Sequence, residues 1–149
     1  MVNSERSRTL TGNGTTLTPH LPSKSAEFLQ PRIAIIDGDE AVLDALRFLF
    51  EAHDFSVSVY ASGAAFLAEP SSIALLIMDQ ALPDAGGLQV IRQFRRAVGA
   101  TVPIVLFSKA SDPEIEARAA DLGVTRVLYK PGVSDLMEAV HSVMAKNAA

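Results

Sequence analysis

The sequence predicts a three-layer α/β domain in which helices cover both faces of a parallel five-stranded sheet. From Pro31 onward, β and α signals alternate at short intervals, which is typical of strands joined by crossover helices. The residues Ile33–Ile36 and the run "IALLIM" are apolar without polar alternation, as expected of central strands buried on both faces. A chain of 149 residues is most simply one such domain.

The first half of the predicted domain alternates strand, helix, strand and helix. A strand over Arg32–Asp37 leads into a helix over about Glu40–His53, whose apolar residues recur at helical spacing. The stretch "FSVSVY" alternates as a half-covered edge strand does. Ser62 then caps a short helix that ends before Pro70.

The middle of the domain is predicted to contain two further strands around a helix. The strand "IALLIMD" stops at Asp79 and is followed by a loop rich in Pro and Gly. The helix after this loop carries Arg92, Arg95 and Arg96, a basic patch that is expected to be its exposed face. The strand "VPIVLFS" ends at Ser108.

The last part of the domain begins with the pattern "SDPE", which predicts a capping box and a proline in the first turn of a helix. Gly123 ends that helix, and the strand "TRVLYKP" delivers Lys130. Ser134 is expected to cap the final helix. One apolar stripe on this helix consists of Leu136, Val140, Val143 and Met144.

The two ends of the chain differ from the domain between them. Residues 1–30 are rich in Ser, Thr, Gly and Asn and have few core-forming side chains, which predicts a disordered N-terminal extension. The domain is expected to span residues 31–146, followed by a short tail over residues 147–149.

The bulk composition disfavours several classes of function. A formal net charge of -4 gives no general attraction to nucleic acid or to anionic membranes. The chain has no cysteine, and no apolar run approaches the ~18 residues that cross a bilayer. His20, His53 and His141 lack metal-ligand spacing and are expected to be solvated. We therefore expect a cytoplasmic protein that binds neither nucleic acid nor membrane directly.

Polar residues stand at the ends of several predicted strands. Asp37 closes the first strand, Asp79 the third, Ser108 the fourth and Lys130 the fifth. Because the carboxyl ends of parallel strands meet at one edge of the sheet, these side chains are expected to surround one hollow. Neighbouring carboxylates repel one another unless a cation lies between them, and a hydroxyl and an ammonium beside them suit a phosphoryl group. Mg²⁺ is the expected cation because it accepts few protein ligands and keeps several waters.

Four motifs carry a resemblance to a known family. They are "IIDGDEAVLDAL", "LLIMDQALPDAGGLQVI" with its Asp-x-x-x-Pro-x-x-x-Gly spacing, "PIVLFS", and "YKP" after the last strand. From Arg32 to about Met144, the chain resembles the receiver domains of bacterial response regulators in two-component signalling. This resemblance implies a flavodoxin-like (βα)5 sandwich in which the strands are ordered 2-1-3-4-5.

The resemblance also implies roles for individual residues. Asp79 would accept a phosphoryl group from a sensor histidine kinase or a phosphotransfer protein. Asp37 and the backbone carbonyl of Ala81 would hold Mg²⁺ together with Asp79. Ser108 would move to bind the phosphoryl group, and Lys130 would pair with it. The phosphorylated protein would signal by binding an unidentified downstream protein, without an enzymatic output domain of its own.

The first departure from the family pattern lies in the turn after the first strand. The family carries a second acid there, which binds the metal directly, whereas this chain has Gly38. The next residue, Asp39, is either a replacement ligand or the cap of the first helix. The missing carboxylate is expected to weaken Mg²⁺ binding.

Further departures lie at the fourth and fifth strands. Lys109 replaces the small residue that usually follows the hydroxyl. Three alternatives are open for its side chain: contact with the phosphoryl group, blocked access to that group, or exposure to solvent. Val127 stands where relatives carry an aromatic residue that swings on activation, which a β-branched side chain cannot do. Tyr129 shares its face of the strand but lies two residues further along. Gly132 replaces an aromatic residue after the Lys-Pro pair.

Two rival functions remain at the level of the sequence. The stretch "IIDGDE" also fits the Asp-x-Asp signature of haloacid-dehalogenase-like phosphatases, with Asp37 as nucleophile and Asp39 as acid. That family needs room for a flap after the first strand, whereas a helix is expected to start there at once. The other rival is a receiver-like interaction module that signals without phosphorylation, which Gly38 and Val127 both favour.

Overall fold

The computed structural model describes residues 31–69, 72–98, 101–129 and 133–148. The expected N-terminal extension, residues 1–30, lies outside the described residues, as do Lys130 and Gly132. Within the described ranges, no helix is both long and apolar enough to cross a membrane.

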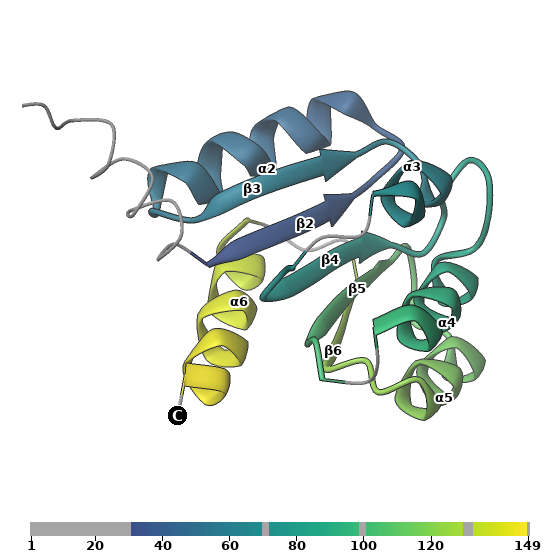
Figure 1. Cartoon of the computed structure of the whole chain (residues 1–149). Coiled ribbons are helices and arrows are strands. Elements are labelled where there is room, and N and C mark those ends of the chain that lie inside the picture. Colours follow the sequence, from purple (N-terminus) through teal and green to yellow (C-terminus); the bar gives the residue numbers. More distant parts are fainter. Residues whose placement is uncertain (1–30, 70–71, 99–100, 130–132, 149) are drawn as a thin grey trace, which may run out of the picture. The chain divides into compact units, whose positions relative to one another are not determined.

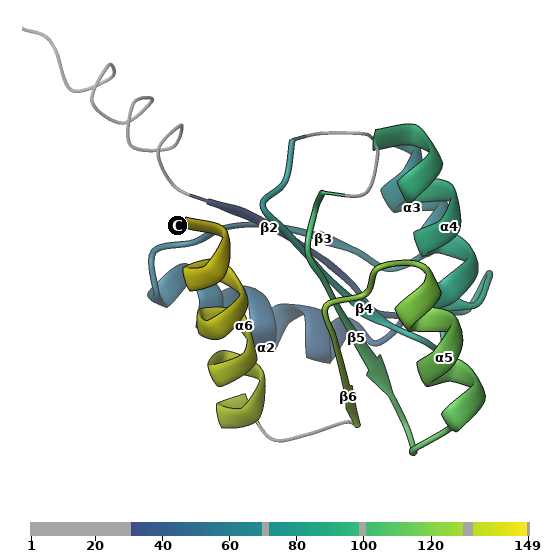
Figure 2. The ribbon, with the colours of Figure 1, turned by 90° about the horizontal axis from the view of Figure 1, so that it is seen from below.

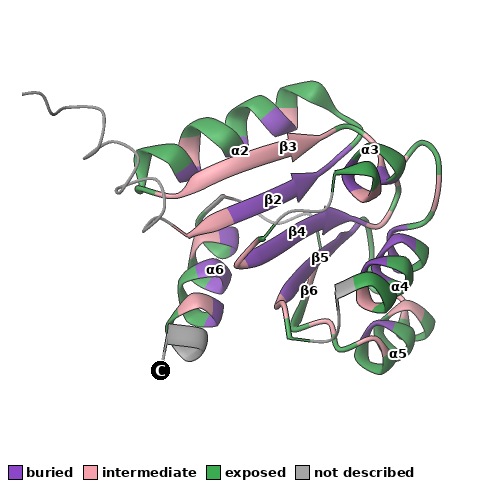
Figure 3. Ribbon diagram, in the orientation of Figure 1, coloured by how far each residue is buried: buried purple, intermediate pink, exposed green. Residues whose placement is uncertain are grey.

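The described residues form one parallel five-stranded sheet with the order β3-β2-β4-β5-β6, which confirms the predicted order 2-1-3-4-5. The residues of β4 and β5 are buried throughout, and those of β3 are half-buried, as expected of central and edge strands (Figure 3). The strands are β2 (Arg32–Ile36), β3 (Ser56–Tyr60), β4 (Leu75–Asp79), β5 (Ile104–Ser108) and β6 (Arg126–Tyr129).

Helices lie on both faces of this sheet, and each face has its own apolar core (Figures 1 and 2). One core contains Ile33, Ile35 and Ile77 from the strands, and the other contains their neighbours Ala34, Ile36 and Met78. The first core is covered by α2 (Glu40–Ala52) and α6 (Val133–Ala148), and the second by α3 (Gly63–Ala68), α4 (Gly87–Val98) and α5 (Pro113–Asp121).

The starts of the helices confirm one predicted cap and correct two others. Ser62 caps α3, since its side chain accepts a hydrogen bond from the backbone N–H of Ala65 at 3.1 Å. The capping box expected from "SDPE" is wrong, because Asp112 is the N-cap of α5 and accepts from the N–H of Glu114 at 3.0 Å. Pro113 therefore stands at the first helical position, which suits its fixed φ.

The final helix also differs from the prediction at both ends. It begins at Val133, so Ser134 lies inside the first turn and is not the cap. At the other end it continues to Ala148, into the segment that was expected to be a tail. The end of α5 agrees with the prediction, because Gly123 follows its last turn with a positive φ of 75°.

Two of the histidines that lack metal-ligand spacing in the sequence lie together in the structure. The rings of His53 and His141 are 6.3 Å apart between centroids, and the His53 ring is also 2.9 Å from the carbonyl of Leu49. His53 is the C-cap of α2 and His141 lies in the middle of α6, and the packing of these two helices on one face of the sheet brings the rings together.

Candidate functional site

The register of the sheet places three predicted site residues at one edge. Ile36 pairs with Met78, so Asp37 directly follows β2 beside Asp79, the last residue of β4. Asp79 in turn pairs with Phe107, so that Ser108 closes the neighbouring strand β5. The predicted convergence of these residues is thus observed, whereas the fourth residue, at position 130, lies outside the described part of the chain.

The two aspartates are buried in spite of their charge. Asp37 exposes 4% of its surface and Asp79 exposes 8%. By the alternation of side chains along a strand, both lie on the same face as Ile35 and Ile77. Because adjacent strands are only about 4.8 Å apart, the two acids stand on neighbouring strand ends, an arrangement that suits a cation between carboxylates.

Each of these carboxylates is held in place by its own turn. Asp37 Oδ1 accepts a hydrogen bond from the backbone N–H of Asp39 at 2.9 Å, and Asp79 Oδ1 accepts one from Ala81 at 3.2 Å. At both strand ends the carboxylate accepts from the backbone N–H two residues further along. This hydrogen bond is typical of a turn that begins directly after the acid.

Gln80 joins the end of β4 to the start of α4. Its backbone N–H donates to the carbonyl of Phe107 at 2.7 Å, and its carbonyl accepts from Gly87 at 2.8 Å. Its side-chain Oε1 accepts from the N–H of Leu88 at 3.1 Å. The first turn of α4 is therefore hydrogen-bonded to the residue next to Asp79.

Gly87 shows why the spacing Asp-x-x-x-Pro-x-x-x-Gly ends in glycine. A Cβ at this position would lie 2.9 Å from the backbone oxygen of Asp79 and 3.0 Å from the Cα of Gln80. These are backbone atoms that cannot turn aside, so any larger residue would displace the strand end that carries the carboxylate.

Asp84 adds a link that the sequence did not reveal. Its two carboxylate oxygens accept hydrogen bonds from the backbone N–H groups of Gly63, at 3.1 Å, and of Ala64, at 2.9 Å. The hydrogen bond from Ala64, followed by that from Gly63, lowers the pKa of Asp84. An acid in a Pro and Gly loop is a common cap, but its partner here lies about twenty residues earlier, beyond any local sequence pattern.

Gly38 also has a packing role that its sequence position did not indicate. A Cβ built on it would lie 3.1 Å from Cδ of Pro83 in the loop after β4, closer than an ordinary contact. The glycine thus allows the turn after β2 and the loop after β4 to approach each other.

Asp39 acts as the N-cap of α2, since its Oδ1 accepts from the N–H of Ala41 at 2.9 Å. Among residues 31–69, 72–98, 101–129 and 133–148, no three acids or histidines cluster in the manner of a metal site. The sequence-predicted donors, the side chains of Asp37 and Asp79 with the carbonyl of Ala81, are all oxygen atoms. Such a set fits Mg²⁺, which is commonly held by one or two carboxylates and several waters.

Ser108 is buried, and its hydroxyl donates to the carbonyl of Ala110 at 3.1 Å, within its own loop. Its partner across the sheet is Tyr129, which exposes 38% of its surface. Val127 is half-buried and packs against the core under α3, α4 and α5. Lys109 is exposed, in agreement with the solvent-facing alternative among those left open by the sequence.

Comparisons with known proteins agree with this geometry. The family model described as "Response regulator receiver domain" matches residues 33–141. The response regulator protein TodT of Pseudomonas putida is 34% identical over 101 residues, which cover 66% of this chain and 44% of that protein. The transcriptional regulatory protein FixJ of Azorhizobium caulinodans is 30% identical over 101 residues, which cover 66% of this chain and 47% of that protein.

A solved structure shows the same fold. The CheY-like response regulator receiver domain protein of Methanospirillum hungatei JF-1 superposes with a TM-score of 0.74 at 22% identity. The match covers 78% of this chain and 95% of that one. Among the curated relatives, by contrast, the chain spans less than half the length of TodT and of FixJ.

Proposed function

The chain belongs to the response regulator receiver domain family of two-component signalling, and we propose that it accepts a phosphoryl group on Asp79. The donor is a sensor histidine kinase or a phosphotransfer protein. The observation that carries the proposal is the pair of buried carboxylates, Asp37 and Asp79, side by side at the carboxyl edge of the sheet. Asp79 is the one that begins the Asp-x-x-x-Pro-x-x-x-Gly loop.

In the proposed reaction, a carboxylate oxygen of Asp79 attacks phosphorus in line. The new O–P bond forms as the P–N bond of the donor phosphohistidine breaks, and the imidazole leaves with a proton. When bound, Mg²⁺ held by Asp37, Asp79 and the carbonyl of Ala81 would neutralise charge on the phosphoryl oxygens. The ammonium of Lys130, which follows Tyr129 in the sequence, is proposed to do the same.

The proposed response to phosphorylation is that the hydroxyl of Ser108 exchanges its hydrogen-bond acceptor. In the structure its hydroxyl donates to the carbonyl of Ala110. We propose that the phosphoryl group, a stronger anionic acceptor, attracts this hydroxyl. The exchange frees the carbonyl of Ala110 and shifts the loop after β5.

The output is proposed to pass through a downstream protein that binds the phosphorylated form. We propose that the chain exchanges phosphoryl groups in the cytoplasm, in keeping with the absence of cysteine.

A phosphorylation-independent interaction module is the second candidate. It is favoured by Gly38, whose contact with Pro83 occupies the side of the turn where a further acid would need room. The phosphatase hypothesis has no such support, because α2 begins at Glu40 and Asp39 is its cap, which leaves no room for a flap.

One experiment distinguishes these functions. The chain is incubated with a small-molecule phosphodonor and Mg²⁺, and its intact mass is followed. We expect one labile phosphoryl group, and no uptake by Asp79→Asn, whose amide is nearly isosteric but is no carboxylate nucleophile. Undiminished labelling of that variant, or labelling at Asp37, would refute the proposal. A complete lack of labelling would favour the interaction module.

A further inference from the structure

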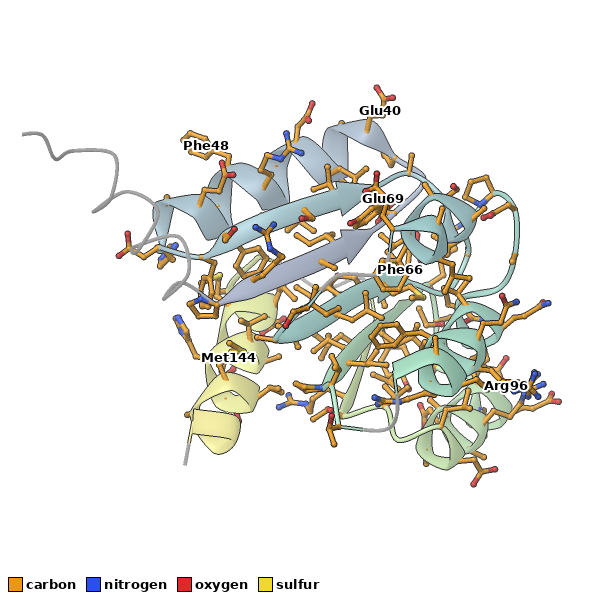
Figure 4. The ribbon with its side chains drawn as sticks, viewed as in Figure 1. Glu40, Phe48, Phe66, Glu69, Arg96 and Met144 are labelled. Atoms are coloured by element: carbon orange, nitrogen blue, oxygen red, sulfur yellow. The ribbon has the colours of Figure 1, made fainter. Side chains whose placement is uncertain are left out.

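A pocket of about 240 Å³ lies between the exposed faces of α4 and α5. Figure 4 shows one of its arginines, Arg96, projecting outward at the edge of the molecule. Four lining residues come from α4, where each lies three and four positions from two of the others, which places them on one helix face. The fifth comes from α5. The lining residues are Gln89, Arg92, Gln93, Arg96 and Arg118.

The three guanidinium groups have no ion-pair or hydrogen-bond partner among the residues that the structure describes. Arg95, although expected in the same patch, is different. It is half-buried, and it donates to the carbonyls of Leu122 at 3.0 Å, Val102 at 2.6 Å and Gly123 at 2.9 Å. Burial lowers the pKa of Arg95. Arg95 therefore holds α4 to the turn after α5, whereas the three arginines of the pocket have no such structural task.

The pocket gathers like charges in a chain whose formal net charge is -4. Three guanidinium groups around one hollow repel one another, and the two glutamines between them are neutral. An anion placed among them would remove this repulsion. The planar fork of arginine matches carboxylate and phosphate oxygens, and glutamine amides add further donors.

The surroundings of the pocket decide between anionic partners. Double-stranded DNA is a long polyanion with a charge about every 1.7 Å along its axis, so most of its charges would lie outside the pocket. The adjacent helix α5 exposes Glu114, Glu116 and Asp121, which would repel such a backbone. A volume of about 240 Å³ is also below the range of about 300–1,000 Å³ typical of small-molecule sites. A few carboxylate side chains, in contrast, fill it without crossing the acidic part of α5.

We propose that Gln89, Arg92, Gln93, Arg96 and Arg118, here called the arginine pocket, form a docking surface for an acidic segment of a partner protein. The surface goes beyond the proposed phosphoacceptor function and does not depend on it, because no residue of the pocket belongs to the site at the strand ends. Its position on α4 nevertheless places it on the helix that Gln80 joins to Asp79.

The test is an NMR titration of the full chain with hexaglutamate, with hexaglutamine as the neutral control peptide. Hexaglutamate should shift the amides of residues 89–96 and of Arg118 saturably, more strongly at low salt, and hexaglutamine should not. Arg92→Gln combined with Arg96→Gln should weaken binding about tenfold. The matched control is Arg47→Gln, an exposed arginine on α2, which covers the opposite face of the sheet.

Three outcomes would overturn the proposal. Hexaglutamate shifts that lie away from α4 and α5 would show that the pocket is not the site. An equal loss of binding in Arg47→Gln would show general charge attraction. Tighter binding of a short DNA duplex than of hexaglutamate at the same amides would assign the pocket to nucleic acid. Because the titration needs no phosphodonor, failure here leaves the result of the labelling experiment at Asp79 unaffected.

Discussion

At the scale of single residues, Gly38 sets how closely the loop after β4 approaches the turn after β2. Replacing it with aspartate adds a carboxylate near Asp37 and Asp79, and Coulomb attraction should tighten Mg²⁺ binding. The new Cβ would lie 3.1 Å from Cδ of Pro83, so the loop has to move slightly. We expect the added charge to outweigh this movement, and Gly38→Asp to bind Mg²⁺ several-fold more tightly in an NMR titration.

Gly38→Ala is the matched control, because it introduces the same Cβ without the carboxylate. It should bind Mg²⁺ no more tightly than the parent chain. If Gly38→Ala and Gly38→Asp changed the affinity equally, then contact with Pro83 rather than charge would govern the site.

Asp39 gives a second prediction at this scale, since its side chain caps α2. Asp39→Ala should lower the free energy of unfolding by about 1 kcal/mol, measured by denaturant titration. Asp39→Ser keeps a capping oxygen and loses the charge, so it should retain most of the stability and the Mg²⁺ affinity. A loss of Mg²⁺ binding in Asp39→Ser as large as that in Asp37→Asn would make Asp39 a metal ligand.

At the scale of elements, α3 depends on contacts from outside itself. It spans 6 residues, fewer than an isolated helix needs to persist in water. Its first N–H groups are bonded by Asp84, from the loop that also carries Pro83 and follows Asp79. The short helix is therefore tied by hydrogen bonds to the loop of the candidate site.

This link predicts a dependence on pH. The pKa of Asp84 is lowered from 3.8 in the folded chain, so its contribution to stability is present above the unfolded pKa and is lost as the pH falls through the folded one. Thermal unfolding of Asp84→Asn should thus depend less steeply on pH than that of the parent chain below about pH 4. Asp121→Asn, which changes an exposed acid at the end of α5, is the control and should keep the parent slope.

At the scale of the whole molecule, the local sequence predicted the layers and the edge that bears the site. Unbroken apolar runs identified β2 and β4, and the acids that end them lie together because parallel strands align their carboxyl ends. The exact caps were less predictable. Asp112 rather than Ser111 caps α5, because neighbouring polar residues compete for the same role and only backbone geometry selects one.

Contacts between distant segments could not be predicted from the sequence. The periodicity of apolar residues indicates which face of a helix or strand is buried, but it does not indicate which polar atoms of other segments contact that element. Arg95 looked like one of three exposed arginines, yet it is bonded to carbonyls about thirty residues away. The pairing of Asp84 with α3 and the approach of Pro83 to Gly38 depend in the same way on loop paths that tertiary packing fixes.

The two routes from Asp79 to the surface lead to a final prediction about the whole domain. One route runs through Ser108 to β6, where Val127 offers no large side chain to swing. The other runs through Gln80, whose Oε1 is bonded to the N–H of Leu88 in α4.

A covalent change at Asp79 displaces its immediate neighbour, so we expect phosphorylation to shift the amides of residues 87–96 more than those of residues 126–129. Gln80→Ala removes the side-chain bond and should reduce the shifts on α4 while leaving those on β6 unchanged. Gln93→Ala, an exposed change on the same helix, should preserve both sets. Two results would show that the signal leaves Asp79 through Ser108 instead: phosphorylation shifts that are largest on β6, or shifts on α4 that are the same in Gln80→Ala as in the parent chain.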